Sequence, residues 1–271
     1  MRGIVALAVV AAVASAALGA ERRPLVAAHR GGALLWPENS LLAFRRALEL
    51  GVDLVETDVH LTADGEVVLI HDPTLDRTTT GRGAVRDLRR ADLPGLRLRG
   101  LDGQPTPEPI PTLRQLLELL RPTRVGLLLE IKGGPDRRRY PGIEEAVLGL
   151  LAETGLAPRT RVMAFEPETL ARVRVLDPGI DVVWLVSRRT LEVAARPASE
   201  IVPWAVQAGV RHLGIEHRLL DASVMTAARA AGLTVGAWTV NEEADIRRAV
   251  AVGADVVITD RPDLALRVVG R

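Results

Sequence analysis

The sequence predicts an α/β protein, a single (β/α)8 TIM barrel with a small insertion after its second strand. Apolar, β-branched segments alternate with amphipathic segments through most of the 271 residues. Strands that alternate with helices indicate a parallel sheet. Eight strand-like segments in a chain of this length favour a closed barrel over an open, doubly wound sheet. The barrel domain is therefore expected to span residues 24–271.

The expected strands are short apolar runs, and the expected helices carry apolar residues at helical spacing. Gly51 and Gly232 each separate a helix from the strand that follows it. The strands are expected at 25–28, 52–60, 125–131, 161–165, 180–186, 210–215, 234–240 and 255–259. The helices are expected at 41–50, 113–120, 143–153, 168–176, 222–231 and 242–250.

One connection, residues 72–111, interrupts this alternation and is rich in Gly, Pro, Thr and Arg. Connections between the strands and helices of such folds are usually about 2–6 residues long. We therefore expect residues 72–111 to form an inserted lid or small subdomain. It follows the second strand, at the end of the barrel where active sites lie.

Composition excludes some classes of function. Apolar residues make up 48% and charged residues 25%, which is typical of a globular protein. Basic and acidic residues number 35 and 34, so the net charge of +1 gives no bulk attraction to nucleic acid. Few aromatic residues are present to stack on bases. Cysteine is absent, which excludes disulfides, thiolate catalysis and cysteine-ligated zinc.

The N-terminus has the layout of a secretory signal peptide. Arg2 precedes an apolar run at 4–18, which ends in small residues. We therefore expect residues 1–20 to be cleaved and the protein to be exported to the periplasm or the extracellular space. The alternative is an uncleaved membrane anchor, although the run is shorter than the roughly 20 apolar residues of a spanning helix.

Two carboxylates lie on one face of the second expected strand. Side chains alternate along a strand, so Glu56, Asp58 and His60 point the same way. Polar groups near the C-terminal end of a barrel strand usually line the active site. Neighbouring carboxylates repel each other, which favours a bound cation, and Mg²⁺ and Ca²⁺ prefer oxygen ligands. The alternative is that one carboxylate is simply solvated at the strand end.

Two histidines end apolar runs in the same part of the expected barrel. His29 follows the first strand, and His71 follows the run at 67–70. A histidine in this position is usually a neutral core residue. Two of them beside a carboxylate pair make general acid–base catalysis plausible.

The third expected strand ends in Glu130 and Lys132, which share one face. Lys132 is the only lysine of the chain, among 35 basic residues. Its compact ammonium suits contact with a phosphate, and the alternative is an ion pair inside the barrel. Trp238, at the end of the seventh strand, either walls an apolar part of a substrate or fills the barrel. Asp260, after the last strand, is either a helix cap or a site residue.

Taken together, these motifs resemble those of the glycerophosphodiester phosphodiesterase family. The resemblance follows the chain in order from residue 29 to residue 260. One departure is Ala164 before Phe165, where the family often has serine. The matching motifs are His-Arg-Gly-Gly at 29–32, Pro-Glu-Asn-Ser at 37–40, Glu-Thr-Asp-Val at 56–59, His-Asp at 71–72, Leu-Asp-Arg-Thr-Thr at 75–79, Ile-Pro-Thr-Leu at 110–113, Glu-Ile-Lys at 130–132, Trp-Thr-Val-Asn at 238–241 and Ile-Thr-Asp at 258–260.

The resemblance implies metal-dependent hydrolysis of a small glycerophosphodiester to glycerol 3-phosphate and an alcohol such as choline. It implies His29 and His71 as the acid–base pair, without fixing which is the acid or whether water or the glycerol 2-hydroxyl attacks. It also implies that Arg30 and Lys132 contact the phosphate. The implied ligands of the single divalent cation, Ca²⁺ or Mg²⁺, are Glu56, Asp58 and Glu130.

The sequence is also compatible with two alternative functions. A phospholipase D-type hydrolase that acts on lysophospholipids would need an apolar groove at the barrel mouth, and it could make peripheral contact with lipid. Hydrolysis of glycerophosphocholine and of its lysolipid would separate these two enzymes. A non-catalytic barrel that binds phosphodiesters should have lost a histidine or a carboxylate, whereas every expected polar residue is present.

Overall fold

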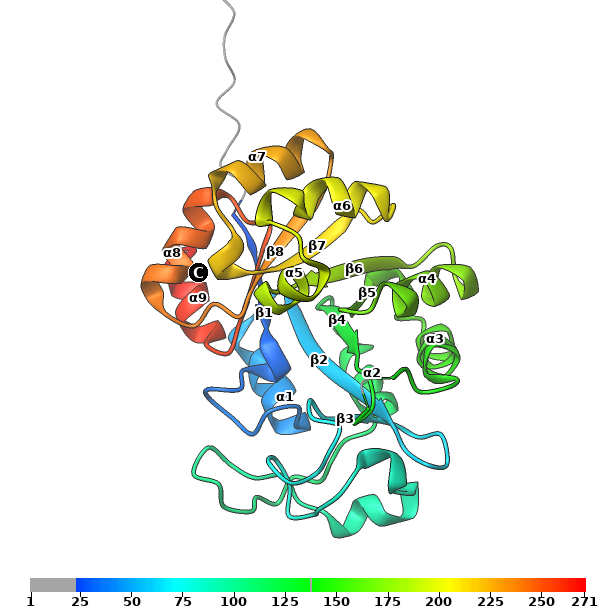
Figure 1. Ribbon diagram of the computed structural model, residues 1–271. Coiled ribbons are helices and arrows are strands. Elements are labelled where there is room, and N and C mark those ends of the chain that lie inside the picture. Colours follow the sequence, from blue (N-terminus) through cyan, green and yellow to red (C-terminus); the bar gives the residue numbers. More distant parts are fainter. Residues whose placement is uncertain (1–22, 137) are drawn as a thin grey trace, which may run out of the picture.

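Eight parallel strands close into a barrel in the computed structural model, which describes residues 23–136 and 138–271 (Figure 1). The strands are hydrogen-bonded in the order β1-β9-β8-β7-β6-β5-β4-β2, and pairing of β1 with β2 closes the ring. The predicted TIM barrel is confirmed, and each predicted strand lies within two residues of its observed bounds. The barrel strands are β1 (Leu25–Ala28), β2 (Leu54–Leu61), β4 (Gly126–Ile131), β5 (Thr160–Ala164), β6 (Asp181–Val186), β7 (His212–Glu216), β8 (Thr234–Trp238) and β9 (Val256–Thr259).

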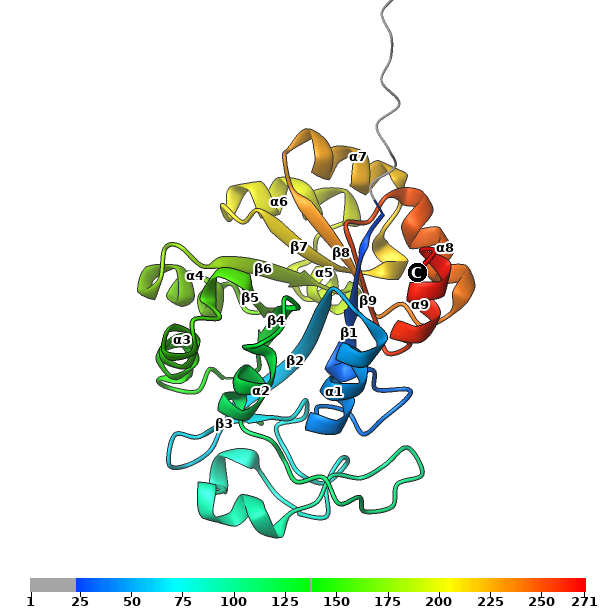
Figure 2. The same ribbon diagram turned by 180° about the vertical axis from the view of Figure 1, so that it is seen from behind.

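Helices cover the outside of the barrel, as both views of the ribbon show (Figure 2). Six of them were predicted, namely α1 (Leu41–Leu50), α2 (Leu113–Leu120), α3 (Ile143–Thr154), α4 (Pro167–Leu176), α7 (Ala222–Ala230) and α8 (Glu243–Val252). Three more were not predicted because each spans only seven residues, too few to show clear periodicity. They are α5 (Arg188–Ala194), α6 (Ile201–Gln207) and α9 (Pro262–Val268).

The apolar core has two layers, and the inner one ends where the polar site begins. The outer layer lies between the strands and the helices. The inner layer fills the barrel with side chains that include Leu54, Leu128 and Ile258. Because side chains alternate along a strand, the inward row that starts at Leu54 continues through Glu56 and Asp58. The carboxylates of Glu56 and Asp58 therefore lie next to the apolar side chains that fill the barrel.

Residues 72–111 lie beside the barrel, next to a short strand, β3 (Val67–Leu69), that pairs antiparallel with β2. The segment contains two 3₁₀ helices, Val85–Asp87 and Arg90–Gly95. Its backbone is fixed by an apolar cluster of its own, which includes Leu75, Val85 and Leu98. It begins at Asp72, directly after the histidine that ends the β2–β3 hairpin.

The predicted signal peptide, residues 1–20, lies outside the described residues. Among residues 23–136 and 138–271, no helix is both long enough and apolar enough to cross a membrane.

Candidate active site

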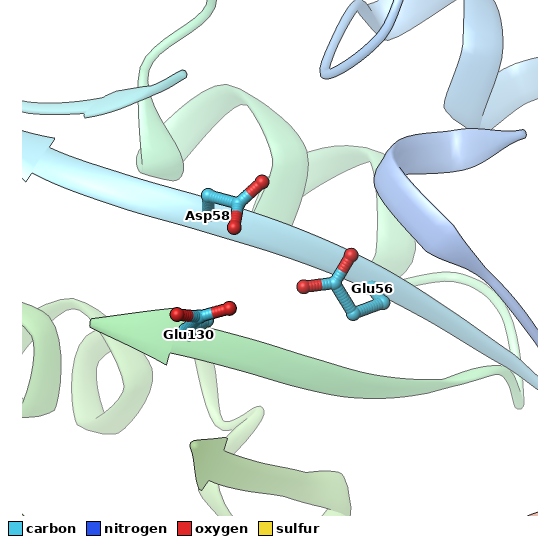
Figure 3. A group of neighbouring side chains, drawn as sticks. All are labelled: Glu56, Asp58 and Glu130. Atoms are coloured by element: carbon cyan, nitrogen blue, oxygen red, sulfur yellow. The ribbon is translucent and has the colours of Figure 1, made fainter. Parts of the chain in front are cut away.

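Three carboxylates converge inside the barrel, near the C-terminal ends of two neighbouring strands (Figure 3). Glu56 and Asp58 come from β2, and Glu130 comes from β4. Asp58 and Glu130 are direct partners in the parallel pairing of these strands, which places both side chains on the inner face. One oxygen of each carboxylate lies within 4.8 Å of the others, and all three residues are buried.

This triad has the properties of a cation site. Burial, together with repulsion from its neighbours, raises the pKa of Glu56 well above its ordinary value. Burial also raises the pKa of Glu130 to about 7, although Lys132 opposes the shift. Oε1 of Glu56 and Oδ1 of Asp58 are buried and accept no hydrogen bond within the described part of the chain. Oxygens crowded in this way fit a divalent cation such as Ca²⁺ or Mg²⁺.

Two cationic side chains border the triad. Nε of Arg30 lies 3.1 Å from Oδ2 of Asp58, and Nζ of Lys132 lies 2.8 Å from Oε1 of Glu130. Nζ of Lys132 also lies 3.5 Å from Oδ1 of Asp58. Burial raises the pKa of Asp58, but Arg30 and Lys132 outweigh burial and hold it below its ordinary value. Asp58 is therefore the carboxylate of the triad that stays ionised at any pH of interest.

The turn after β1 brings Arg30 to the triad. Arg30 has a left-handed backbone with φ of 51°, and the two glycines after it also have positive φ. This path points the Arg30 amide at Glu56, where it donates a hydrogen bond of 2.9 Å to Oε2. A Cβ at Gly31 would meet the Cβ of Ala43 at 2.7 Å, so the turn can pack on α1 only with glycine there.

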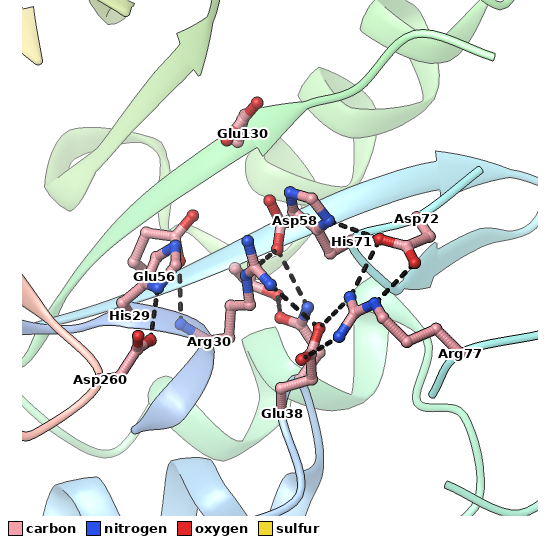
Figure 4. Close-up of polar contacts among 12 residues, drawn as sticks. His29, Arg30, Glu38, Glu56, Asp58, His71, Asp72, Arg77, Glu130 and Asp260 are labelled. Atoms are coloured by element: carbon pink, nitrogen blue, oxygen red, sulfur yellow. Dashed lines mark hydrogen bonds and ion pairs between the residues drawn. The ribbon is translucent and has the colours of Figure 1, made fainter. Parts of the chain in front are cut away.

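His29 is held by a carboxylate from the far end of the chain (Figure 4). Its Nδ1 lies 2.6 Å from Oδ1 of Asp260, which follows β9. The amide of Asn241 donates to Oδ2 of Asp260 at 2.7 Å. Burial raises the pKa of Asp260, but the hydrogen bonds from His29 and Asn241 outweigh it and keep the carboxyl ionised. Asp260 is thus a partner of His29, and the alternative of a helix cap does not apply, because Arg261 occupies the position before α9.

His71 has a matching partner in the segment after β3 (Figure 4). Its Nδ1 lies 2.7 Å from Oδ1 of Asp72. Arg77 donates from Nε to Oδ2 of Asp72 at 2.7 Å, and it also donates to both oxygens of Glu38. Glu38 in turn accepts a hydrogen bond of 3.1 Å from Arg30. Burial lowers the pKa of His71 despite Asp72, so the imidazole is neutral near pH 7.

His60 contacts the backbone of His71 and supports it. Its Nδ1 lies 2.8 Å from the Tyr140 hydroxyl, and its Nε2 lies 3.0 Å from the backbone oxygen of His71. Burial lowers the pKa of His60 to about 4. A neutral, fully buried His60 therefore fixes the backbone of His71 and does not reach the pocket.

A cavity of about 110 Å³ joins these groups. Its apolar wall includes Phe165 and Trp238, whose rings meet edge to face with centroids 5.5 Å apart. Asp58 does not line the cavity, but its two oxygens contact Arg30 and Lys132, which do. The other sequence-predicted site residues all line this one cavity, namely His29, Arg30, Glu56, His71, Glu130, Lys132 and Trp238.

Comparison with known proteins agrees with this geometry. A family model described as the glycerophosphoryl diester phosphodiesterase family matches residues 29–264. The chain belongs to this family. The phosphodiesterase family expected from the sequence is therefore confirmed, and so is the prediction of an enzyme.

Relatives and solved structures of the family cover nearly the whole chain. A glycerophosphodiester phosphodiesterase of Caldanaerobacter subterraneus subsp. tengcongensis is 32% identical over 91% of this chain and 98% of its own length. A phosphodiesterase of Oleispira antarctica, solved with sn-glycerol-3-phosphate, has a TM-score of 0.76 and 29% identity over 92% of this chain and 97% of that one. A glycerophosphodiester phosphodiesterase of Agrobacterium tumefaciens has a TM-score of 0.74 and 27% identity over 90% of this chain and 99% of that one.

Sequence reasoning assigned no role to several residues that hold the site together. Asn39 donates to Asp58 at 3.1 Å and accepts from Thr57 at 2.8 Å, with a left-handed φ of 56°. Glu38 and Arg77 connect the β1 turn to the segment after β3. Their motifs were visible in the sequence, but the contacts join distant segments, so no local pattern could have revealed their partners.

Proposed function

We propose that this protein hydrolyses glycerophosphodiesters to glycerol 3-phosphate and an alcohol, with one divalent cation and two histidines as general acid and base. The observation that carries the proposal is the convergence of a buried carboxylate triad with two carboxylate-supported histidines on one cavity. The product bound to the Oleispira antarctica relative supports the same substrate class.

Glu56, Asp58 and Glu130 are the residues that would hold the cation. A divalent cation at such a site polarises a phosphoryl oxygen and stabilises the negative charge that develops there. Arg30 and Lys132 border the same cavity and add positive charge beside the phosphoryl group. Because the guanidinium of Arg30 is fixed by Glu38 and Asp58, little reorganisation is needed when the substrate binds.

His29 and His71 are arranged to move protons at Nε2. In both, a carboxylate accepts the hydrogen bond from Nδ1, so the neutral imidazole carries its proton there. Nε2 is then free to accept a proton from the attacking hydroxyl or, when protonated, to donate one to the leaving alcohol. Each such transfer contributes about 10²–10⁴-fold to the rate. The attacking hydroxyl is that of water or the glycerol 2-hydroxyl.

Release of glycerol 3-phosphate from glycerophosphocholine tests the proposal. The protein is assayed with EDTA, and again after Ca²⁺ or Mg²⁺ is restored in separate samples, which also identifies the preferred cation. His29→Ala serves as the variant, and Arg82→Gln serves as the control, because Arg82 is exposed and does not line the cavity. Release that needs a cation and is lost only in His29→Ala is expected. No release with either cation would contradict the proposal.

We also propose that the protein is exported after cleavage of residues 1–20. The support is the order of a basic residue, an apolar run and small residues at the N-terminus. Cell fractionation with N-terminal sequencing tests this: a shortened chain outside the cytoplasm is expected. A full-length chain in the membrane fraction would instead support an uncleaved anchor.

A further inference from the structure

The barrel has a second polar layer at the N-terminal ends of its strands, opposite the catalytic cavity. Arg161 shares the inner face of β5 with Met163, and its register partner on β6 is Asp181. On β7 and β8, His212 and Thr234 take the inward positions of this layer and are also register partners. Polar side chains therefore face the barrel interior at an end that the catalytic chemistry does not use.

Arg161 is weakly paired within this layer. Its Nε lies 4.0 Å from Oδ2 of Asp181, and its side chain makes no hydrogen bond among residues 23–136 and 138–271. Oδ1 of the same carboxylate instead lies 3.2 Å from Arg211 and 3.3 Å from Nε2 of His212. Burial, together with the charge of Arg161, lowers the pKa of His212, so the imidazole is neutral near pH 7. One carboxylate is thus shared by two guanidinium groups, and the layer carries excess positive charge.

Two cavities, here called the basal cavities, open at this end of the barrel and share Arg161 and Leu25 in their walls. Their volumes are about 460 and 760 Å³, within the range of about 300–1,000 Å³ that is usual for ligand sites. One guanidinium is therefore within reach of a ligand in either cavity. Among the described residues, none that lines the catalytic cavity also lines a basal cavity.

The walls of the basal cavities are strongly cationic. In the described part of the chain, two aspartates, Asp53 and Asp255, face five arginines, namely Arg23, Arg124, Arg159, Arg161 and Arg229. Both aspartates are already engaged by the backbone, because Oδ2 of Asp53 accepts from the Val26 amide at 2.9 Å and Oδ2 of Asp255 accepts from the Val235 amide at 2.8 Å. The excess of guanidinium groups suits an anion, and the planar fork of arginine matches the oxygens of a phosphate.

Two of these arginines are held in place by neutral groups. Arg159 donates to the backbone oxygens of Leu120 and Val125, and Arg229 donates to that of Gly253 at 3.0 Å. A carbonyl oxygen fixes a guanidinium without cancelling its charge, so the positive charge remains at the cavity wall. Fixed cations bind an anion with little loss of side-chain freedom.

We propose that the basal cavities form a second binding site, which takes the phosphate of a phosphomonoester, with Arg161 as its central ligand. A phosphomonoester carries close to two negative charges at neutral pH, so it compensates two guanidinium groups, whereas a phosphodiester carries one. The phosphate comes from a free organic phosphate or from the head group of a phosphomonoester lipid, since both present the same group. This site is separate from the hydrolase function proposed above and does not depend on it.

Binding of glycerol 3-phosphate to the purified protein provides the first test. Calorimetry is done in EDTA at low ionic strength, where charge pairs are least screened. The variant Lys132→Gln identifies any binding that belongs to the catalytic cavity. We expect the binding that remains in Lys132→Gln to weaken about ten- to hundredfold when Arg161→Gln is added, because a charge-assisted contact is lost. Circular dichroism and thermal unfolding in phosphate-free buffer check that each variant is folded.

A pair of exposed arginines gives a second comparison that leaves the barrel interior unchanged. Arg124 lines one basal cavity, whereas Arg121, three residues earlier, is not among the described residues that line either. Because both side chains are exposed, both variants should fold even if Arg161→Gln does not. We expect Arg124→Gln to weaken the same binding about two- to fivefold, and Arg121→Gln to leave it unchanged.

Vesicles separate the two sources of the phosphate. The protein is sedimented with phosphatidylcholine vesicles that contain phosphatidic acid, and with vesicles of phosphatidylcholine alone. Binding of free glycerol 3-phosphate that depends on Arg161 and Arg124 would support a soluble ligand. Binding only to the vesicles with phosphatidic acid, with the same dependence, would support a lipid head group.

The inference is overturned if neither probe binds less tightly to Arg161→Gln or Arg124→Gln. It is also overturned if Arg121→Gln weakens binding as much as Arg124→Gln, because the effect would then be one of general surface charge. All of these measurements record binding in the absence of a divalent cation. Their outcome is therefore the same whether or not the protein hydrolyses glycerophosphodiesters.

Discussion

The two histidines of the site carry equivalent hydrogen bonds but are supported in different ways. His29 and Asp260 lie 2.6 Å apart, and His71 and Asp72 lie 2.7 Å apart. The first pair connects the ends of β1 and β9, which are hydrogen-bonded neighbours in the barrel. The second lies at the start of the irregular segment after β3, and Arg77 fixes its carboxylate. We call them the barrel pair and the insertion pair.

The side chains of the insertion pair are also more exposed to solvent than those of the barrel pair. The side chains of the barrel pair are 14% and 15% exposed, whereas those of the insertion pair are 31% and 26% exposed, and Arg77 is 47% exposed. Hydrogen-bonded strands hold a side chain independently of salt, whereas partly exposed ion pairs are screened. The barrel pair is thus positioned by the fold itself, and the insertion pair by a guanidinium that contacts two carboxylates.

The largest expected effect distinguishes the chemical roles of the pairs. His29→Ala and His71→Ala should each lower kcat for glycerophosphocholine by about 10²–10⁴-fold, because each removes one proton transfer. Glycerophospho-p-nitrophenol has a leaving group that needs no protonation. The variant that lacks the general acid should therefore recover most of its activity with this substrate, and the variant that lacks the base should not. Recovery in both variants, or in neither, would contradict a division of labour between the pairs.

Changes to the two aspartates should have unequal effects. Asp260 accepts hydrogen bonds from both His29 and Asn241 through separate oxygens, so Asp260→Asn leaves one acceptor for two donors in a mostly buried place. We expect a loss in kcat of about a hundredfold. Asp72 is more exposed, so water can replace a hydrogen-bond partner that is lost in Asp72→Asn. We therefore expect a smaller loss in kcat, of about tenfold. Steady-state kinetics measures kcat of both variants, after their metal content has been checked. Equal losses in kcat would contradict the inference that the two pairs are supported in different ways.

Arg77 should act as a positioning residue for the insertion pair. Arg77→Gln removes a positive charge beside Asp72, so the pKa of His71 should rise. The limb of the pH–rate profile that belongs to His71 should then move to higher pH, and the other limb should stay. We expect kcat/KM to decrease by about tenfold or less. Arg82→Gln, in the same segment, is the control; a uniform loss with an unchanged profile would mean that Arg77 acts only on folding.

The residues of the barrel pair and the triad show what a sequence can predict. Strand periodicity was enough to put Glu56 and Asp58 on one face, because alternation is a local property. The closed barrel then brings Glu130 beside Asp58, since β2 and β4 are neighbours. The role of Asp260 could not be assigned from its neighbours in the sequence, because a carboxylate before a helix is also a common helix cap. Only the pairing of β1 with β9 places it against His29.

The insertion pair shows where sequence reasoning stops. Residues 72–111 have neither helical nor strand periodicity, and their course depends on a small apolar cluster around Leu75, Val85 and Leu98. The contact between Arg77 and Glu38 spans 39 residues and joins two irregular segments. The apolar cavity lined by Phe165, Trp184 and Trp204 depends in the same way on loops after β4 and β5 that meet two short helices, α5 and α6. Such features follow from tertiary packing and carry no local signal.

The smallest expected effect concerns the triad between the two pairs. In the absence of a cation the folded protein raises the pKa of Glu130 from 4.5 to about 7, mainly through burial. The folded state therefore binds this proton more tightly than the unfolded state, and stability is lost as the pH rises from about 4.5 to 7. The Glu130→Gln variant has no carboxyl group to ionise at this position, so it does not lose stability in this way. In EDTA, the stability of the unmodified protein should therefore fall relative to Glu130→Gln across this range, by on the order of 1–3 kcal/mol.

A divalent cation should reverse that difference. It binds the ionised carboxylates, so its stabilising effect grows with pH and with cation concentration in the unmodified protein. Glu130→Gln, which has lost one ligand, should gain much less. Thermal unfolding of both proteins between pH 5 and 8, with EDTA or with Ca²⁺ or Mg²⁺, measures all four curves, and shifts of a few degrees are expected. If the cation stabilised both proteins equally at every pH, it would bind elsewhere, and the two histidine pairs would flank a triad that holds no metal.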